Sequence, residues 1–333
     1  MRSFEYAAPK APQQALGLLG RNWGESEILA GGTDLLALMK DDVVRPRRLV
    51  NVKAVEGADL HALMRRQNGL QIGALVSIAR VAESADIRQR YPMLANAAVE
   101  AASPQIRNMA TMGGNICQRP RCWYFRNGFG LLAVDKKTGK SLVLEGDNRY
   151  HAILGNEGPA YFVSPSSIVP SLVAYGAKIT LASAKGTREV PLEKFFVTPR
   201  EENQREHDLR PDEMLTFISL PAPPAGARVA HYEVRQKAAV DGPLATCAAL
   251  LEMSGGTVKT ARIVMGHVAP IPWISQEAAQ AIAGKPVNEE TAEAAGAAAV
   301  AQAKSLGRNG YKIKLARVAV KRAILAAAQG GQA

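Results

Sequence analysis

Apolar residues in the first 55 positions follow spacings that predict a small α/β unit. Residues 12–21 have the spacing of an amphipathic helix, and the short apolar runs at 26–30 and 49–52 indicate strands. The pattern therefore predicts a unit over about 1–55 in which helices and short strands alternate.

A second and larger unit is predicted over about 56–222. A strand pattern at 70–74 precedes helical spacing over 76–99, where Ser77 is a candidate N-cap, and alternation over 177–182 indicates a further strand. Together the two units form a first domain, 1–222.

The proline-rich segment at 221–226 is a predicted domain boundary. Beyond it we expect a C-terminal α+β domain, 227–330, with three strands followed by two helices. The strands are predicted at 230–235, 243–253 and 258–268, and the helices at 289–306, capped by Asn288, and at 311–327.

Composition agrees with a chain that forms more than one core. The 333 residues, 47% of them hydrophobic, exceed what one compact core usually contains. The first residues lack the apolar segment of a signal peptide, and no run of about 18 apolar residues is available to span a bilayer. We therefore expect a cytoplasmic protein that does not enter a membrane.

The cysteine count and the charge distribution argue against a disulfide-stabilised protein and against a nucleic-acid-binding protein. Three cysteines, Cys117, Cys122 and Cys247, are too few for a disulfide framework, and the odd number fits a reducing compartment. The net charge is +11, but the basic residues are scattered with few aromatic residues between them. This distribution favours solubility and phosphate or partner contacts over nucleic-acid binding.

Two glycines, Gly31 and Gly32, follow the strand predicted at 26–30 and precede a leucine-rich helical segment. Paired glycines let backbone N–H groups approach a phosphate closely, and a helix N-terminus adds positive potential. The alternative is a tight turn in which Thr33 or Asp34 only caps the helix. On this motif alone the turn is the simpler interpretation.

A second glycine pair in the segment 105–115 changes that balance, because two such loops can clasp one diphosphate from both sides. Neither loop is a P-loop, since no Gly-Lys-Ser/Thr follows, and neither has the Gly-x-Gly-x-x-Gly of a Rossmann site. The near match at 128–133 has no predicted strand before it.

The segments Ala-Gly-Gly-Thr-Asp-Leu at 30–35 and Gln-Ile-Arg-Asn-x-Ala-Thr-x-Gly-Gly-Asn at 105–115 resemble the FAD-binding subunit of molybdenum hydroxylases. This family includes xanthine dehydrogenase, carbon monoxide dehydrogenase and aldehyde oxidoreductase. The resemblance extends over nearly the whole chain. It implies an α+β fold with a two-part FAD-binding domain of the vanillyl-alcohol-oxidase-like type, followed by a C-terminal α+β domain with a small sheet and helices.

The resemblance implies that both loops bind FAD. Backbone amides of the first loop are expected at the diphosphate, and the positions are Leu29, Ala30, Gly31, Gly32, Thr33, Asp34 and Leu35. The second-loop positions are Ala110, Thr111, Gly114, Asn115 and Ile116. Ser167 stands where many relatives have an acidic residue near the flavin, and Glu233 stands where a basic residue is frequent.

The aperiodic loop at about 116–158 resembles, around Cys122, a branch of the family whose flavin subunit carries a four-iron cluster. The other ligand positions have no thiolate, so we predict no cluster and no other metal in this chain. Those positions fall near Leu132, Ser141 and Ala160. Partner docking is then the expected role of the loop.

The resemblance implies an electron-transfer subunit without a catalytic side chain. Its implied partners are a large subunit that binds molybdopterin, a small subunit with two-iron clusters, and an external electron acceptor. His151, the loop histidine that suggests acid–base chemistry, has no visible carboxylate partner and is predicted to be structural. Two alternatives stay open: a free-standing FAD-dependent oxidase and a non-catalytic assembly subunit.

Overall fold

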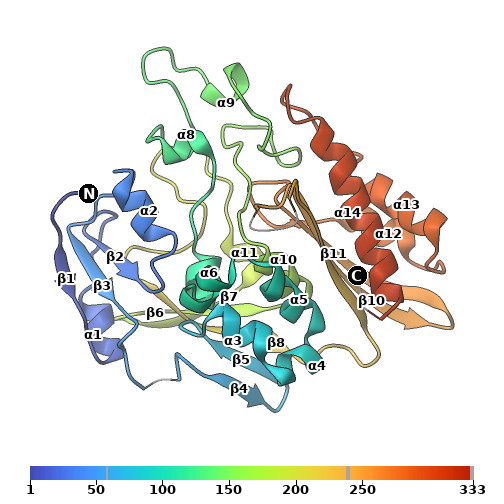
Figure 1. Cartoon of the computed structure of the whole chain (residues 1–333), viewed down its shortest axis with the longest axis horizontal. Coiled ribbons are helices and arrows are strands. Elements are labelled where there is room, and N and C mark those ends of the chain that lie inside the picture. The colour runs from blue at the N-terminus through green and yellow to red at the C-terminus, as the bar shows by residue number, and fades with distance from the viewer. Residues whose placement is uncertain (58, 238–240, 331–333) are drawn as a thin grey trace.

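The computed structural model describes residues 1–57, 59–237 and 241–330, which fold around three β-sheets (Figure 1). The first sheet is parallel, with the strand order β1 (Glu5–Ala7), β3 (Arg48–Asn51), β2 (Ser26–Leu29). Parallel strands need crossover connections, and α1 (Pro12–Gly17) and α2 (Leu35–Lys40) provide them. Both predicted strands of this unit are confirmed to within one residue.

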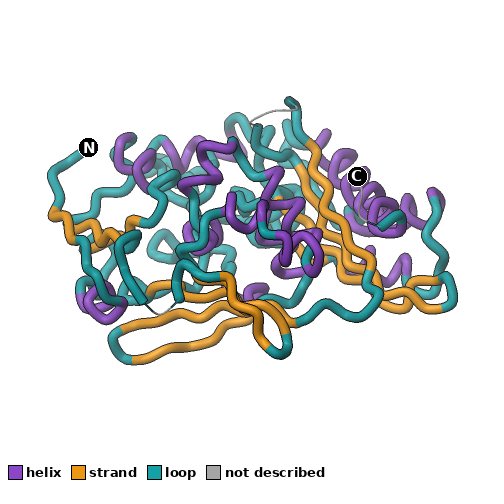
Figure 2. Tube along the Cα trace, turned by 60° about the horizontal axis from the view of Figure 1, so that its bottom comes forward, coloured by secondary structure: helices purple, strands orange, loops and turns teal. Residues whose placement is uncertain are grey.

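The second sheet has five antiparallel strands and is covered by helices on one face, as Figure 2 shows. In sheet order the strands are β4 (Leu63–Arg66), β5 (Gly69–Gly73), β8 (Met214–Pro221), β6 (Lys178–Ser183) and β7 (Gly186–Pro191). The helices are α3 (Ile78–Glu83), α4 (Ala85–Arg90), α5 (Pro92–Glu100), α6 (Pro104–Met109), α7 (Met112–Ile116), α10 (Ile168–Ala174) and α11 (Leu192–Phe195).

The helical stretch predicted over 76–99 is divided into three helices. Ser77 caps the first as predicted, because its hydroxyl accepts the backbone N–H of Arg80. Ser84 ends α3 and caps α4, and Pro92 occupies the first turn of α5, where its missing N–H costs no hydrogen bond. The predicted helical spacing is therefore confirmed, whereas the prediction of one continuous helical stretch is wrong.

The third sheet is antiparallel and lies between two layers of helices. Its strands in order are β12 (Trp273–Ile274), β11 (Thr257–Gly266), β10 (Ala245–Ser254) and β9 (Arg228–Val234), and its helices are α12 (Gln276–Ile282), α13 (Glu289–Ala299) and α14 (Tyr311–Ala328). In β10, Cys247 and Ala249 pack towards α14, whereas Ala248 and Leu250 belong to the core that includes α5 and α10. Both faces are buried, which explains the continuous apolar run.

Helix α13 is shorter than the predicted 289–306. Asn288 caps it as predicted, accepting the N–H of Thr291 at 2.9 Å, but the helix ends at Ala299. After Ala299 the backbone forms hydrogen bonds with another segment instead: the N–H of Lys304 donates to the Ile153 carbonyl at 2.8 Å. Tertiary hydrogen bonds therefore replace the last helical turns.

Residues 117–158, within the loop predicted at about 116–158, form a mostly irregular segment that projects beyond the sheets (Figure 1). Its helices are the short α8 (Trp123–Arg126) and α9 (Leu142–Glu145). Among residues 1–57, 59–237 and 241–330, no helix is long and apolar enough to cross a membrane.

Candidate functional site

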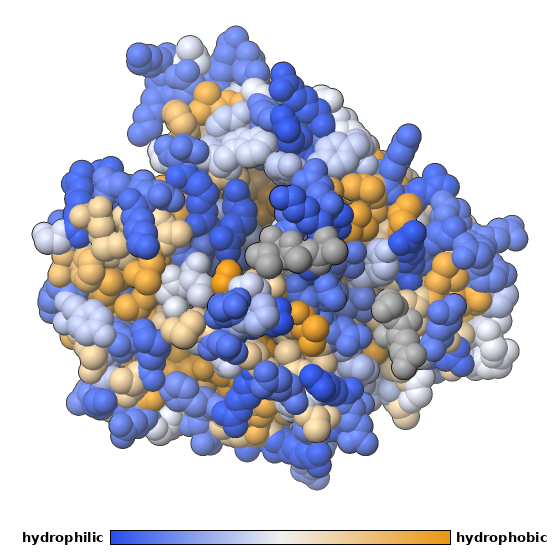
Figure 3. All heavy atoms as spheres, viewed as in Figure 1, coloured by the Kyte–Doolittle hydropathy of each residue, from blue (hydrophilic) through white to orange (hydrophobic). Residues whose placement is uncertain are grey.

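A cavity of about 700 Å³ lies where the three sheets and the projecting loop meet. Trp23 lines it from the first unit, Ser167 from the second, His267 from the third and Trp123 from the loop. Figure 3 shows that the surface is hollowed at the base of the projecting loop. The volume falls within the range of small-molecule sites, roughly 300–1,000 Å³.

The first glycine loop forms one wall of this cavity. From Gly31 to Leu35, the backbone N–H groups donate no hydrogen bond to any other described residue. Gly32 has φ +75°, a left-handed conformation that glycine adopts readily, and α2 begins directly after the loop. Successive free N–H groups at a helix start form a concave anion-binding surface.

Gly31 is where the two predicted loops touch. A Cβ atom at Gly31 would lie 2.0 Å from the carbonyl oxygen of Met109, so a larger residue would force the two backbones apart. Glycine is therefore required by close packing between loops, a reason that the sequence alone did not indicate. The structure brings the two segments together, as the clasp interpretation expects.

The second loop uses its backbone amides differently from the first. The N–H groups of Met112 and Gly113 donate to the carbonyls of Val76 and Ala74 at 2.8 and 2.9 Å, and that of Gly114 donates to the Thr111 hydroxyl at 3.2 Å. The first two amides hold the loop to the segment that follows β5, and that of Gly114 bonds within the loop itself. The second loop therefore faces the cavity mainly with side chains, whereas the first offers free N–H groups.

The structure places most of the predicted site residues along the cavity wall. Those that line it are Ala30, Gly31, Gly32, Thr33, Asp34, Leu35, Ala110, Thr111, Gly114, Asn115 and Ser167. Leu29 and Ile116 lie behind the wall, 8% and 1% exposed, in the hydrophobic cores.

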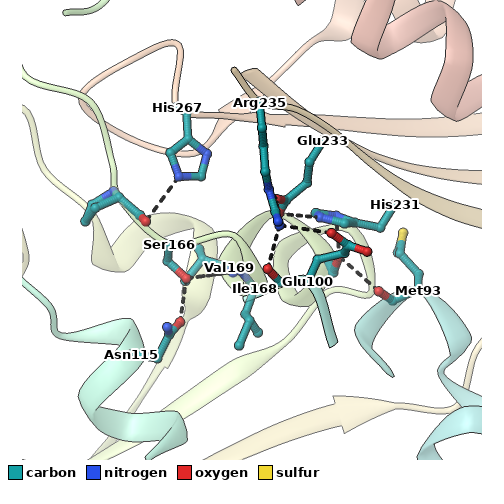
Figure 4. A network of polar contacts seen from close by, with 12 residues as sticks. Met93, Glu100, Asn115, Ser166, Ile168, Val169, His231, Glu233, Arg235 and His267 are labelled. Carbon is teal, nitrogen blue, oxygen red and sulfur yellow. Dashed lines mark hydrogen bonds and ion pairs between the residues drawn. The ribbon is translucent and has the colours of Figure 1, made fainter. Parts of the chain in front are cut away.

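Ser166 is a residue that sequence reasoning missed. Its hydroxyl donates to the Asn115 side-chain oxygen at 2.6 Å and accepts the backbone N–H groups of Ile168 and Val169 (Figure 4). It thereby caps α10 and fixes the orientation of Asn115 at the cavity. Its neighbour Ser167 lines the cavity without capping the helix.

Asp34 connects the first glycine loop to the projecting loop. Its position is that of the N-cap of α2, but its side chain makes no capping bond. Instead the carboxylate accepts the backbone N–H of Arg119 at 2.9 Å and the guanidinium of Arg126 at 2.8 Å. The capping role considered for Asp34 is therefore wrong, because the charge-assisted bonds across the cavity rim take its place.

Cys122 and His151 form a polar pair in the cavity wall, with 3.2 Å between Sγ and Nε2. Burial raises the pKa of the Cys122 thiol and lowers the pKa of His151 to about 4, so both groups are neutral near pH 7. Within the part of the chain that the structure describes, no three metal-ligating side chains come together. Cys247 is fully buried in β10.

Glu233 lies in a buried network with His231 and Arg235 (Figure 4). Burial alone would raise its pKa, but the hydrogen bond from His231 at 2.9 Å and the charges around it lower the pKa to about 2. Arg235 also bonds to Glu100 on α5 and lines the cavity. The negative charge at Glu233 is thus paired with a neighbouring cation at the cavity wall.

Comparison with known proteins agrees with this geometry. Residues 2–223 match the family described as FAD binding domain in molybdopterin dehydrogenase, and residues 230–327 match the CO dehydrogenase flavoprotein C-terminal domain. The aldehyde oxidoreductase FAD-binding subunit of Escherichia coli is 31% identical over 274 residues, which are 82% of this chain and 84% of that one. The carbon monoxide dehydrogenase medium chain of Hydrogenophaga pseudoflava is 30% identical, covering 97% and 96%.

Solved structures superpose along the whole chain. A carbon monoxide dehydrogenase from Hydrogenophaga pseudoflava has a TM-score of 0.77 at 28% identity, with 99% of both chains covered. Quinoline 2-oxidoreductase from Pseudomonas putida 86 has a TM-score of 0.75 at 25% identity, covering 99% of this chain and 98% of that one. The chain therefore belongs to the FAD-binding subunits of the molybdenum hydroxylases, oxidoreductases of the xanthine and carbon monoxide dehydrogenase type.

Proposed function

We propose that this chain transfers electrons from the two-iron clusters of a small partner subunit to an external acceptor, in a complex whose large subunit binds the molybdenum cofactor. When bound, FAD supplies the redox step, because a flavin accepts single electrons and releases them as a pair. The relatives named as medium or FAD-binding subunits of dehydrogenases support this assignment. We also propose that the FAD-binding domain ends at 222 and that the C-terminal domain begins at 227.

The observation that carries the proposal is the row of free backbone N–H groups from Gly31 to Leu35 at the cavity wall. A diphosphate needs several hydrogen-bond donors and favours the positive end of a helix, and this loop offers both. The first loop would then donate backbone hydrogen bonds to the diphosphate. The second loop would contact the cofactor through side chains, among them Asn115, which Ser166 holds in place.

Ser167 and Arg235 also line the cavity, Ser167 directly before α10 and Arg235 directly after β9. The Ser167 hydroxyl offers a neutral hydrogen bond there. The Arg235 guanidinium is already paired with Glu233 and Glu100, so this part of the wall is polar without free positive charge. The role of these residues is to orient the cofactor and to exclude water, while the partner subunits and the acceptor approach from outside.

Four measurements, taken in order, test the proposal. First, FAD released by acid from the purified chain should approach one equivalent. Second, a two-iron subunit and a molybdopterin-binding subunit should co-purify from the native host. The reduced two-iron subunit, freed of excess reductant, should then bleach the visible flavin absorption of this chain under anaerobic conditions. Reoxidation by NAD⁺, a quinone or oxygen, compared in parallel, identifies the acceptor.

Each alternative gives a different result. Lack of FAD in the purified chain would favour an assembly subunit. FAD that is reduced directly by a small organic substrate, without any partner, would favour a free-standing oxidase. Absence of bleaching by the reduced two-iron subunit, in a chain that does hold FAD, would overturn the electron-transfer role while leaving the cofactor assignment intact.

A further inference from the structure

His267 follows β11 directly and lines the cavity with its backbone in the left-handed region, at φ +62°. Left-handed backbone suits glycine, and for a histidine it is a strained conformation that other interactions must hold in place. Observed strain of this kind is concentrated at functional sites. The side chain is 5% exposed, so its presence there is not explained by contact with solvent.

The imidazole of His267 makes one hydrogen bond to the part of the chain that the structure describes. Its Nε2–H donates to the carbonyl of Pro165 at 3.1 Å (Figure 4). Pro165 lines the cavity and precedes Ser166. Burial lowers the pKa of His267 to about 4, so the ring is neutral near pH 7 and donates through one nitrogen only. Its Nδ1 has no partner among the described residues.

Lys312, in the first turn of α14, fixes the His267 backbone. The residue is 1% exposed, and its amino group donates to three carbonyls, those of Tyr150 and His151 at 3.1 Å each and that of His267 at 2.8 Å. Burial lowers the pKa of Lys312 to about 7. A buried ammonium must satisfy its three donors, and these bonds do so. Lys312 therefore joins α14, the projecting loop and the end of β11 at one point.

We infer that His267 is a positioning residue that, clamped by Lys312, holds the 164–167 segment against the bound FAD. The chain of contacts is continuous: the His267 ring bonds to Pro165, the next residue Ser166 bonds to Asn115, and Asn115 lines the cavity. A glycine at 267 would relax the backbone but remove the donor. The inference rests on the proposed placement of FAD in this cavity.

Three substitutions at this position separate strain from positioning. His267→Ala keeps the strained conformation and removes the donor, His267→Gly removes both, and His267→Asn keeps a donor in a residue that tolerates left-handed backbone. Thermal midpoints of the FAD-free chain and dissociation constants for FAD are measured for all three and for the unmodified chain. The visible spectrum of bound flavin is recorded as a second measure of its environment.

We expect the glycine variant to melt about 2 °C or more above the alanine variant, because it relieves the backbone. Both should bind FAD roughly 10-fold more weakly than the unmodified chain, as expected for loss of one buried hydrogen bond. The asparagine variant should recover most of the affinity.

Equal FAD affinity and equal spectra in all four proteins would overturn the inference. An unmodified chain that binds no FAD would instead overturn the proposed function. If alanine fails to fold, the glycine and asparagine variants alone decide the outcome.

Discussion

The Asp34 carboxylate and the Arg126 guanidinium, 2.8 Å apart, join the first glycine loop to a segment 92 positions later in the chain. Both side chains are largely buried, with 15% and 16% exposed, and Arg126 also bonds to the carbonyls of Pro120 and Arg119. The projecting loop thus holds the free N–H groups of the first loop in place from the opposite side of the cavity rim.

Replacing Arg126 with methionine should weaken FAD binding by about 10-fold or more, since a charge-assisted hydrogen bond is worth about 1.5–3 kcal/mol. A fluorescence titration with FAD measures the change. The control is Arg45→Met, which breaks the more exposed 2.7 Å pair of Arg45 with Asp42 and should change affinity less than twofold. Equal effects of both variants would show that the Asp34 contact does not position the loop.

The contact between Gly31 and Met109 predicts that Gly31→Ala loses bound FAD. The added Cβ must move the two loops apart, since it would lie 2.0 Å from the Met109 oxygen, and we expect a stability loss of about 1–3 kcal/mol. Gly17→Ala is the control, because its Cβ would meet nothing within 4 Å. Flavin content and thermal midpoint are measured for both. Normal flavin content in Gly31→Ala would contradict the close packing of the two loops.

Glu233→Gln should destabilise the protein by about 3 kcal/mol, because Arg235 would lose its buried countercharge. The control is Glu293→Gln, in which a partly exposed carboxylate loses its pairs with Arg317 and Lys321 at an expected cost below about 1 kcal/mol. Urea unfolding of both variants gives the comparison. A loss below about 1 kcal/mol for Glu233→Gln would mean that the network does not stabilise the junction of the second and third sheets.

Buried neutral histidines predict acid sensitivity. Burial lowers the pKa values of His151, His207 and His267 to about 4, below the value of about 6.5 for an unfolded chain. Between these values the unfolded chain binds more protons than the folded one, so stability falls as the pH falls from about 6.5 to about 4.

His207 offers a test, since its ring stacks on Phe195 with 5.3 Å between the ring centroids. Its Nε2 lies 3.5 Å from the Glu206 carboxylate, and neither ring nitrogen has a hydrogen-bond partner among the described residues. Between pH 7 and pH 4.5, the free energy of unfolding of His207→Leu should fall by about 2 kcal/mol less than that of the unmodified chain. Denaturant unfolding at both values measures this difference. Parallel losses in the two proteins would show that His207 is protonated in the folded state.

The strands and the two glycine loops were predictable because their signals are local. The run 26–30 and the capping residues Ser77 and Asn288 act within a few residues of themselves, so the sequence contains the information. The early end of α13 was not predictable, because it depends on a hydrogen bond from Lys304 to Ile153, 151 positions apart.

The same distinction applies to the site. The segment 30–35 was identified from its glycines, but the reason for Gly31, contact with Met109, is tertiary. Ser166 and His267 gave no sequence signal, since a serine before a helix and a histidine after a strand are common. Only the fold brings them to neighbouring residues of one cavity wall, Asn115 and Pro165. Backbone strain, as at His267, appears only in the folded structure.

Because Arg235, His267 and Lys312 belong to the third unit and line the same cavity as the glycine loops, cofactor loading and docking of that unit are thermodynamically linked. By reciprocal linkage, the free energy by which bound FAD favours docking of the third unit equals the free energy by which docking favours FAD binding. Domain 1–222 prepared alone would accordingly be a weak FAD binder rather than a minimal flavoprotein.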